Sequence, residues 1–405
     1  MKNKKILLII GFILIISLIA FALYYVFIRQ KETTPIINLP GINAPTTGLP
    51  GAETGTPPGL VINTPSTVSP LPTASSVASG GLTQSPALTS LPVKDITLAS
   101  DGKSINFYSP NEGKFYKIDS SGQTVALSNK TFFDVQKITW SPQGTKSILE
   151  FPDNSKIFYD FNSNKQVTLP KHWEDFSFSN SGNQIAAKSL GLDKDNRWLL
   201  LSNPDGTEAE PIFALGNNED KVTVSYSPAG GIIGFSDTGH PQGFAKKQIV
   251  TLGSTGETLN PLMVEGLSFE PIWSTKGDKL VYSTYNLDSE YKPTLWVTNA
   301  QGEQTGTGRH KLNVNTWSEK CSFADNQTLY CAVPQALIYG AGFEPSLTDN
   351  VADEIYKIDL TTNAKTLIAQ PESSSNISSM VISQDKSTLY YTDKNTGLLH
   401  EIKLK

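Results

Sequence analysis

Cysteine, histidine and methionine are scarce in this 405-residue chain, which contains two, four and three of them respectively. Two cysteines cannot cross-link a domain of this size, so its fold must rest on a hydrophobic core. Basic residues are also fewer than acidic ones: the chain has 33 Lys and Arg and 38 Asp and Glu, which gives a net charge of -5. Such a chain lacks the basic face that nucleic-acid binding requires, and we expect no nucleic-acid partner.

The short motifs of metal, phosphate and nucleotide chemistry are also missing. The sequence contains no H-E-x-x-H, C-x-x-C, P-loop or G-x-G-x-x-G pattern. A serine-hydrolase elbow of the form G-x-S-x-G is missing too, since Gly253-Ser-Thr-Gly256 has the wrong spacing. The four histidines are scattered one to a region. We therefore expect no metal and no cofactor, and the sequence identifies no catalytic residue.

A long apolar run lies close to the N-terminus. Residues 6–28 contain no charged side chain, and 17 of the 23 are Ile, Leu, Val or Phe. As a helix they would extend ~34 Å, enough to cross the ~30 Å hydrocarbon core. Three lysines among residues 1–5 favour a cytoplasmic N-terminus. We predict a single transmembrane helix; a cleaved signal peptide is the alternative, because Ala20-Phe21-Ala22 has the pattern of a cleavage site.

The segment that follows, residues 31–86, is dominated by Pro, Ser, Thr and Gly. Eleven of the 25 prolines fall between positions 35 and 92, and Glu53 is the one charged residue between positions 33 and 93. A segment of this composition cannot bury enough apolar surface to offset its ordering entropy. We predict a disordered stalk, which could reach ~190 Å as polyproline II or ~45 Å as a random coil.

A turn flanked by short apolar strands recurs seven times in residues 87–405. Trp140-Ser-Pro-Gln-Gly144 and Tyr226-Ser-Pro-Ala-Gly230 are the clearest copies, and the seven turns fall at positions 102, 144, 182, 230, 277, 326 and 386. Polar turns of a second kind, such as that ending at Gly206, lie between them. Four short antiparallel strands every ~40–50 residues are typical of a propeller blade. We therefore predict an all-β, seven-bladed β-propeller of four-stranded antiparallel blades.

The last repeat has only three strands before the chain ends at Lys405. A missing fourth strand would leave an open sheet edge, which folded proteins avoid. We predict that residues 87–91, which precede the first blade, supply that strand and join the two ends of the domain.

The Trp-Ser-Pro-x-Gly turn followed by a short apolar strand resembles the WD40-like (PD40) repeat of TolB-type propellers, over about residues 95–405. No copy keeps all four letters of the usual Ser-Pro-Asp-Gly turn. The resemblance implies the propeller fold. In that family the fold serves as a protein-docking platform or as the gating propeller of prolyl-oligopeptidase-like enzymes. This chain has no residues left over for the hydrolase domain of such an enzyme.

Cys321 and Cys331 lie on either side of the sixth of these turns. With the strands of each blade lettered A to D from the inside outwards, this turn joins strands A and B. The two cysteines would then face each other across the hairpin, which makes them candidates for a disulfide in an oxidising compartment. Two buried thiols on adjacent strands are the alternative.

Long insertions between strands B and C occur in three consecutive repeats, the fourth to the sixth, at residues 237–247, 285–294 and 334–353. All B–C loops of a propeller emerge on one face. Aromatic residues in long loops are enriched at recognition surfaces. Local packing of the rings is the alternative. The candidate binding residues in these loops are His240, Phe244, Tyr285, Tyr291, Tyr339 and Phe343.

Together these features predict a single-pass cell-membrane protein with its N-terminus in the cytoplasm and its propeller outside. The predicted function is binding of a protein, peptide or glycan, or scaffolding, at the cell surface. Two other functions remain open. One is an extracytoplasmic hydrolase or lyase with its active site at the propeller channel mouth, and the other is a structural component of an envelope complex.

Overall fold

The computed structural model describes residues 15, 17–18, 21, 73–243 and 245–405. The chain divides into two units, Met1–Val68 and Ser69–Lys405. In the first unit the four described residues are helical. The rest of the predicted membrane segment, and residues 31–72 of the predicted stalk, lie outside the described residues. No described helix combines the length and the apolar character needed to cross a membrane.

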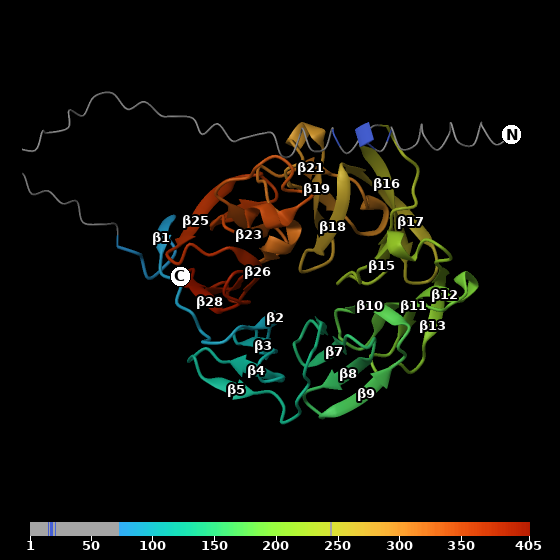
Figure 1. Ribbon diagram of the computed structural model, residues 1–405, viewed down its shortest axis with the longest axis horizontal. Helices are drawn as coiled ribbons and strands as arrows, with labels where there is room; N and C mark the ends of the chain where they lie inside the picture. Colours follow the sequence, from blue (N-terminus) through green and yellow to red (C-terminus); the bar gives the residue numbers. More distant parts are fainter. Residues whose placement is uncertain (1–14, 16, 19–20, 22–72, 244) are drawn as a thin grey trace, which may run out of the picture. The chain divides into compact units, whose positions relative to one another are not determined.

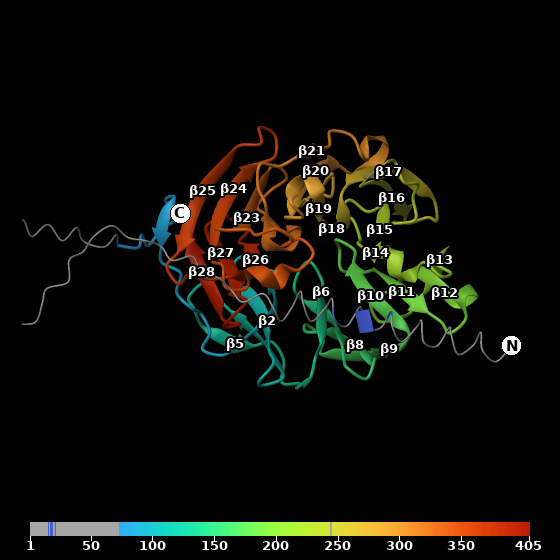
Figure 2. The ribbon, with the colours of Figure 1, turned by 45° about the horizontal axis from the view of Figure 1, so that its top comes forward.

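The second unit consists of seven sheets arranged in a ring (Figure 1). In each sheet the strands follow one another in sequence order and consecutive strands pair antiparallel, except that β1 is added in parallel to β25. The first strand of a blade, such as β2 or β18, lies toward the centre, and the last, such as β5 or β13, lies at the rim (Figure 1). A second view shows the same succession of blades (Figure 2). The predicted seven-bladed propeller is confirmed.

The first four blades each have four strands. Blade one contains β2 (Lys94–Leu98), β3 (Ile105–Ser109), β4 (Lys114–Ile118) and β5 (Thr124–Ala126); blade two contains β6 (Lys137–Trp140), β7 (Lys146–Glu150), β8 (Lys156–Asp160) and β9 (Lys165–Leu169); blade three contains β10 (Trp173–Phe178), β11 (Ile185–Leu190), β12 (Arg197–Ser202) and β13 (Glu210–Ala214); blade four contains β14 (Val222–Val224), β15 (Ile232–Ser236), β16 (Lys246–Gly253) and β17 (Thr258–Glu265).

The last three blades differ in their outer strands. Blade five contains β18 (Leu267–Trp273), β19 (Lys279–Tyr285), β20 (Thr294–Asn299) and β21 (His310–Lys311); blade six contains β22 (Cys321–Phe323), β23 (Thr328–Pro334), β24 (Asp353–Asp359) and β25 (Lys365–Pro371), with β1 (Gly81–Thr83) added outside β25; blade seven contains β26 (Ile377–Ile382), β27 (Thr388–Asp393) and β28 (Leu399–Lys403).

Six short 3-10 turns lie in connections between strands, and residues 73–243 and 245–405 contain no α-helix. The turns are η1 (Lys194–Asn196), η2 (Glu219–Lys221), η3 (Leu287–Ser289), η4 (Gly302–Gln304), η5 (Ser318–Lys320) and η6 (Pro345–Thr348).

The predicted A–B turns coincide with the hairpins that open each blade, and their glycines have two separate roles. The glycines at positions 102, 144, 182, 230 and 277 all have positive φ, between 65° and 73°. Side chains other than glycine rarely adopt this conformation. A Cβ on Gly144 would lie 2.4 Å from the carbonyl oxygen of Leu98 in blade one, and a Cβ on Gly277 would lie 2.5 Å from the amide nitrogen of Ala229 in blade four. The repeated glycine therefore shapes the turn and also allows adjacent blades to approach.

The hydrophobic core consists of clusters that lie between neighbouring blades. One cluster joins Val281 and Leu295 of blade five to Leu329 and Ile358 of blade six. The cluster between blades seven and one includes Tyr390 and Leu399 together with Ile105 and Phe107. Seven such clusters are present in the described part of the chain, one for each neighbouring pair. Each blade therefore depends on its neighbours to shield its sheet faces.

The two ends of the domain meet at blade seven. Ala87 forms an isolated antiparallel bridge with His400 of β28. The Leu88 amide donates to the Leu399 carbonyl at 2.7 Å, and the Val93 amide donates to the Gly397 carbonyl at 2.8 Å. The segment predicted to complete blade seven therefore does pair with β28, but through a bridge and not through a continuous strand. Further upstream, β1 runs parallel to β25 of blade six, in a region that was predicted to belong to the stalk.

Turn aspartates with lowered pKa values predict acid sensitivity. Hydrogen bonds from Lys165 and Thr207 lower the pKa of Asp205 to about 2, and hydrogen bonds from Ser155 lower the pKa of Asp153 to about 2. The ordinary pKa is 3.8, so this stabilisation is complete above about pH 4 and is lost as the pH falls toward 2. We expect the melting temperature, followed by circular dichroism, to drop across this window. The drop should be shallower for Asp205→Asn, and a melting temperature that does not change with pH there would contradict the expectation.

Candidate functional site

One face of the ring carries both the B–C loops and the connections between one blade and the next. We call it the loop face. In blades four, five and six the B–C loops span residues 237–245, 286–293 and 335–352, as predicted from the insertions. The connection between blades five and six contains η5 and therefore emerges on this same face.

Four of the six predicted aromatic and histidine residues come together on the loop face. The Phe343 ring centroid lies 4.7 Å from that of Tyr285 and 4.6 Å from that of Tyr291. The Tyr291 and Tyr339 centroids are 5.7 Å apart. We call these four residues the aromatic cluster. The rings do pack against one another, yet Tyr339 remains 63% exposed and Phe343 53% exposed. The cluster therefore presents aromatic surface to solvent.

Local sequence explains how the blade-five loop presents its tyrosine. Asn286 caps η3 by accepting a hydrogen bond from the Ser289 amide at 3.0 Å, and the Ser289 hydroxyl lies 3.2 Å from the Asn286 amide. This capping box begins the turn. The turn ends at Glu290, which has the left-handed conformation, and Tyr291 follows with φ of 52°. A positive φ is uncommon for tyrosine, so the surrounding contacts must hold Tyr291 in this conformation.

The loops of blades five and six are fastened to each other by their backbones. The Gly340 amide donates to the Glu290 carbonyl at 3.0 Å, and the Gly342 amide donates to the Tyr291 carbonyl at 2.7 Å. A Cβ on Gly342 would lie 2.6 Å from the Cβ of Tyr285, so only glycine allows this approach. The aromatic cluster is thus built on two mutually supported loops.

The remaining two predicted residues are not part of this cluster. His240 is exposed in the blade-four loop, where its carbonyl accepts a hydrogen bond from the Gln248 amide at 3.3 Å. Phe244 lies outside the described residues. In the described part of the chain, no ring contact joins His240 to the four aromatic residues.

A pocket of about 220 Å³ opens beside the aromatic cluster, and we call it the loop-face pocket. Tyr285 and Phe343 of the cluster contribute to its wall. Its remaining lining comes from strands A and B and the B–C loop of blade five, from the blade-six loop and from the η5 connection: Ser268, Glu270, Ser283, Thr284, Pro293, Trp317, Glu319, Gly342 and Pro345.

Two carboxylates, Glu270 and Glu319, line this pocket. Burial raises the pKa of Glu270, and the nearby negative charge of Glu319 raises it further. A hydrogen bond from the Ser268 hydroxyl, at 3.4 Å, opposes this effect. Strand β18 has an irregular register between Leu267 and Glu270, and Ser268 has φ of 64°. Bulges of this kind redirect a side chain, and this one lies where Glu270 joins the pocket.

The turn η5 is held from both sides. The Ser318 hydroxyl donates to the Glu270 carbonyl at 2.6 Å and lies 3.1 Å from the Ser283 hydroxyl of blade five. The Thr316 hydroxyl, just before the turn, donates to the Ala332 carbonyl of blade six at 2.6 Å. These contacts fix the positions of Trp317 and Glu319, which flank Ser318 in the sequence.

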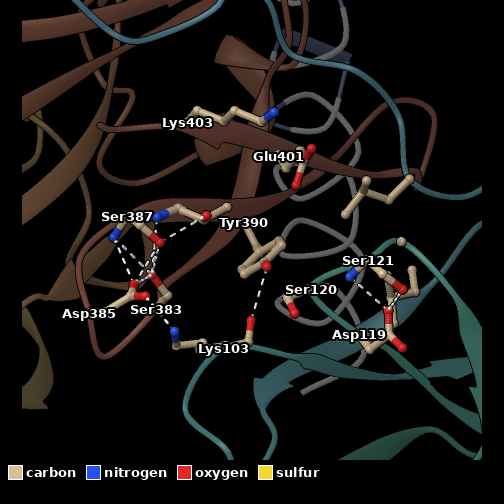
Figure 3. A pocket seen from close by; sticks show the side chains of 14 residues that line it. Lys103, Asp119, Ser120, Ser121, Ser383, Asp385, Ser387, Tyr390, Glu401 and Lys403 are labelled. Carbon is tan, nitrogen blue, oxygen red and sulfur yellow. Dashed lines mark hydrogen bonds and ion pairs between the residues drawn. The ribbon is translucent and has the colours of Figure 1, made fainter.

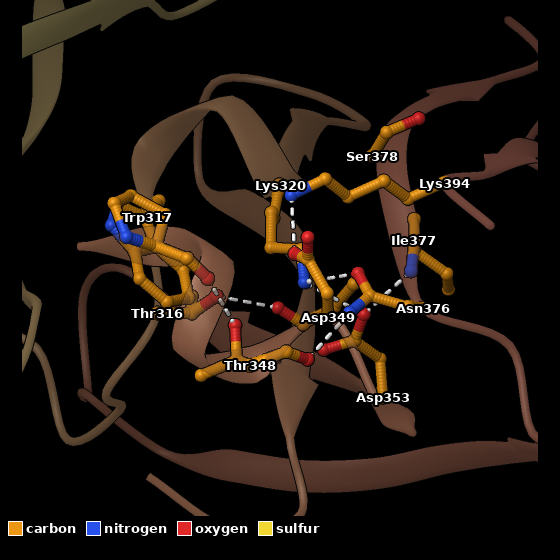
Figure 4. A network of polar contacts seen from close by, with 12 residues as sticks. Thr316, Trp317, Lys320, Thr348, Asp349, Asp353, Asn376, Ile377, Ser378 and Lys394 are labelled. Atoms are coloured by element: carbon orange, nitrogen blue, oxygen red, sulfur yellow. Dashed lines mark hydrogen bonds and ion pairs between the residues drawn. The ribbon is translucent and has the colours of Figure 1, made fainter. Parts of the chain in front are cut away.

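A buried ion pair fastens the other end of η5 (Figure 4). The Lys320 ammonium lies 2.8 Å from Asp353 Oδ2 and 3.3 Å from Asn376 Oδ1. The Lys320 side chain is 7% exposed and the Asp353 side chain is fully buried. Asp353 Oδ2 also accepts a hydrogen bond from the Ile377 amide at 2.6 Å, and Asn376 donates to the Thr348 carbonyl at 2.7 Å. The network thus ties η5 to the C-terminal end of the blade-six loop and to blade seven.

Sequence reasoning missed Glu270, Trp317, Glu319 and the Lys320–Asp353 pair. The candidate residues came only from the long B–C loops. The connections between blades lie on the same face and were not considered. A signal was present, because Trp317-Ser-Glu-Lys320 is a cluster of large and charged residues directly before a strand A. Such a cluster on the loop face could have been added to the candidate residues.

A larger pocket, of about 420 Å³, lies at the seam between blades one and seven (Figure 3). Its two turn carboxylates are already satisfied. Asp119 Oδ1 accepts from the Ser121 hydroxyl at 2.6 Å, and Asp385 accepts from the Ser387 hydroxyl at 2.6 Å and pairs with Lys103 at 3.2 Å. Tyr390 donates to the Lys103 carbonyl at 2.9 Å. These contacts serve turn geometry and ring closure, so we place the functional site on the loop face.

The two cysteines lie directly opposite each other on β22 and β23. Their sulfur atoms are 2.08 Å apart and form a disulfide within blade six. The bond links β22, which follows η5, to β23, which leads into the blade-six loop. In the described part of the chain, no three His, Cys, Asp or Glu side chains are grouped so that they could hold a metal ion.

No family model matches the sequence, and no curated protein matches it. Solved structures do match. An oligogalacturonate lyase from Vibrio parahaemolyticus superposes with a TM-score of 0.55 at 12% identity, covering 79% of this chain and 93% of the lyase. These likenesses show the fold alone.

An oligogalacturonate lyase in complex with manganese gives a TM-score of 0.54 at 12% identity, over 79% of this chain and 93% of that protein. The β-propeller domain of Cps50 (Swd1) from Myceliophteria thermophila gives 0.54 at 11% identity, over 79% of this chain and the whole of that domain. Proteins with such different titles share this architecture, so function must be argued from the site.

Proposed function

We propose that this chain is a ligand-binding propeller that recognises its partner through the loop face. The observation that carries the proposal is the aromatic cluster, in which two rings remain more than half exposed beside a pocket. Tyrosine and phenylalanine supply large contact area with little loss of conformational entropy, and binding energy at interfaces concentrates on such anchors.

Further exposed apolar side chains lie on the same two loops. Leu287 belongs to the blade-five loop, and Ile338 and Leu347 belong to the blade-six loop; all three are exposed. The two loops that carry them are joined by backbone hydrogen bonds, and exposed apolar side chains that gather in one region of a surface are typical of a contact with a partner. The ion pairs and the capping box that support these loops are typical of a pre-organised binding surface, which lowers the entropic cost of association.

The proposal includes attachment to a cell membrane, with the propeller outside and residues 1–5 in the cytoplasm. Its support is the charge-free run of residues 6–28 and the lysines that precede it. A disulfide in blade six suits an oxidising compartment. The proline-rich residues that follow the apolar run would hold the propeller away from the membrane. The resemblance to TolB-type repeats supports a docking role and belongs to the same proposal.

The enzyme alternative has one observation in its favour, the paired carboxylates Glu270 and Glu319. A hydrolase or lyase needs an acid and a base within reach of the same bond. No histidine, lysine or cysteine lines the loop-face pocket, so the two glutamates would have to perform both tasks. Ligand binding requires only the contacts already present, and we therefore place it first.

The test is a binding screen of the full-length chain, purified in mild detergent, against arrays of peptides and oligosaccharides. For any ligand found, we expect Tyr339→Ser/Phe343→Ser to weaken binding by about 30-fold or more, because it removes two exposed aromatic anchors. Val125→Ser is the control, since Val125 is an exposed apolar side chain, 46% exposed, on the outer strand β5 at the rim of blade one. Equal affinity of the double variant and the wild type would remove the loop face as the binding surface.

A further inference from the structure

Neither carboxylate of the loop-face pocket has a basic partner among the described residues, unlike the carboxylates of Glu150 in blade two and Asp175 in blade three. Asp175 pairs with Lys188 at 2.8 Å and with Lys137 at 3.2 Å, and Lys137 also lies 3.6 Å from Glu150. By contrast, neither Glu270 nor Glu319 forms an ion pair with any residue in 73–243 or 245–405.

Two like charges without a cation in a partly closed pocket repel each other. The Glu270 side chain is exposed at the mouth of the pocket, and loss of solvation together with the charge of Glu319 raises its pKa, which disfavours its ionised form. A ligand that brings a positive charge would relieve this repulsion, and a neutral ligand would leave it in place.

The walls of the pocket fit the same kind of ligand. Tyr285, Phe343 and Trp317 contribute aromatic rings to the lining, and cations bind favourably over ring faces. The chain uses such contacts elsewhere, since the Arg309 guanidinium lies 4.7 Å from the Trp296 ring centroid and the Lys365 ammonium lies 4.1 Å from that of Tyr356. Carboxylates and aromatic rings around one small volume are typical of sites for basic groups.

The size of the pocket points to one long basic side chain as the carrier of that charge. A volume of about 220 Å³ is below the range of drug-sized sites and suits a single long side chain. Trp317 is 8% exposed, and its indole N–H has no hydrogen-bond partner among the described residues. This nitrogen has almost no accessible surface, so the pocket offers a ligand the ring of Trp317 and not its N–H group.

We propose that the loop-face pocket binds a lysine or arginine side chain of a protein partner, between Glu270 and Glu319 and against the rings of Tyr285 and Phe343. The exposed rings of the aromatic cluster then contact the neighbouring residues of the partner. This proposal rests on the proposed function and specifies its partner as a basic peptide segment.

The test uses three synthetic peptides that differ at one central position, which is arginine, lysine or the neutral isostere citrulline. Their affinities for the full-length chain are measured by isothermal titration calorimetry at low salt. We expect the arginine and lysine peptides to bind at least 10-fold more tightly than the citrulline peptide. We expect Glu319→Gln and Glu270→Gln each to lower the affinity for the arginine peptide by about 10-fold. The affinity for the citrulline peptide should not change.

Glu303→Gln is the matched control, since Glu303 is an exposed carboxylate on η4 in blade five, away from the pocket lining. It should bind all three peptides as the wild type does. A second readout is the indole N–H resonance of Trp317, assigned with Trp317→Phe, which should shift when the arginine peptide is added. This readout also shows whether the glutamine variants retain the folded pocket.

Equal affinity for the arginine and citrulline peptides, or no loss in either glutamine variant, would overturn the basic-ligand proposal. If a neutral oligosaccharide binds and loses affinity in Tyr339→Ser/Phe343→Ser, the proposed function stands and the basic-ligand proposal falls. If the arginine peptide binds but is insensitive to the aromatic and glutamate variants alike, both proposals fail.

Discussion

Lys320→Met is expected to lower the free energy of unfolding by about 3–5 kcal/mol, because it leaves a buried carboxylate without its counter-ion. Asp353 is fully buried, and its Oδ2 atom would retain only the Ile377 amide, at 2.6 Å. Its Oδ1 atom has no partner among the described residues even in the wild type. Burial already raises the pKa of Asp353 against the opposing effect of Lys320, so removal of the lysine leaves the charge uncompensated.

The measurement is urea denaturation of the full chain, followed by near-ultraviolet circular dichroism. Lys394→Met is the matched control, since the Lys394–Asp349 pair lies near the same network with side chains 42% and 37% exposed. An exposed pair should cost less than about 1 kcal/mol. The double variant Lys320→Met/Asp353→Leu should recover much of the loss, because no unpaired charge then remains. If Lys320→Met is as mild as Lys394→Met, the buried pair does not hold η5 as described.

Removal of residues 1–93 is expected to destabilise the propeller by on the order of 5 kcal/mol, whereas removal of residues 1–72 should have little effect. The longer deletion removes β1 from the edge of blade six and the segment that bridges Ala87 to His400. It also removes Val93, which is 8% exposed and packs between blades one and seven. Strand β28 would become an open edge, which promotes association between chains.

Thermal unfolding and gel filtration of the two truncated chains provide the measurement. The shorter deletion serves as the control, because every contact of the described propeller remains. We expect the chain that starts at Lys94 to melt at a clearly lower temperature and to aggregate. Equal melting temperatures for the two chains would show that the ring closes without the N-terminal segment.

Much of the fold could be predicted because each blade carries its own local signals. Glycine is required at positions such as Gly144 and Gly277 because the turn has a positive φ and because the adjacent blade leaves no room for a Cβ atom. Glycine therefore recurs with the period of the repeat. The facing positions of Cys321 and Cys331 follow from hairpin register alone. Strand β1 could not be predicted, because its glycine-rich, proline-flanked sequence resembles the stalk and only pairing with β25 orders it.

The candidate site was predictable in part, for a different reason. Insertions identify loops on one face, and this was enough to predict that Tyr285, Tyr291, Tyr339 and Phe343 lie on the same face, where their rings pack together. Glu270 and Glu319 join them only because blades five and six dock through Ser318. Contacts between residues of separate repeats depend on that docking geometry, and no spacing within one repeat reveals them.

The most direct test of the account is a crystal structure of the chain with the arginine peptide bound. The account predicts the guanidinium in the loop-face pocket, hydrogen-bonded to Glu270 and Glu319, with the peptide backbone crossing Tyr339. A peptide that instead occupies the seam between blades one and seven, or that leaves the loop-face pocket empty while binding elsewhere, would contradict it.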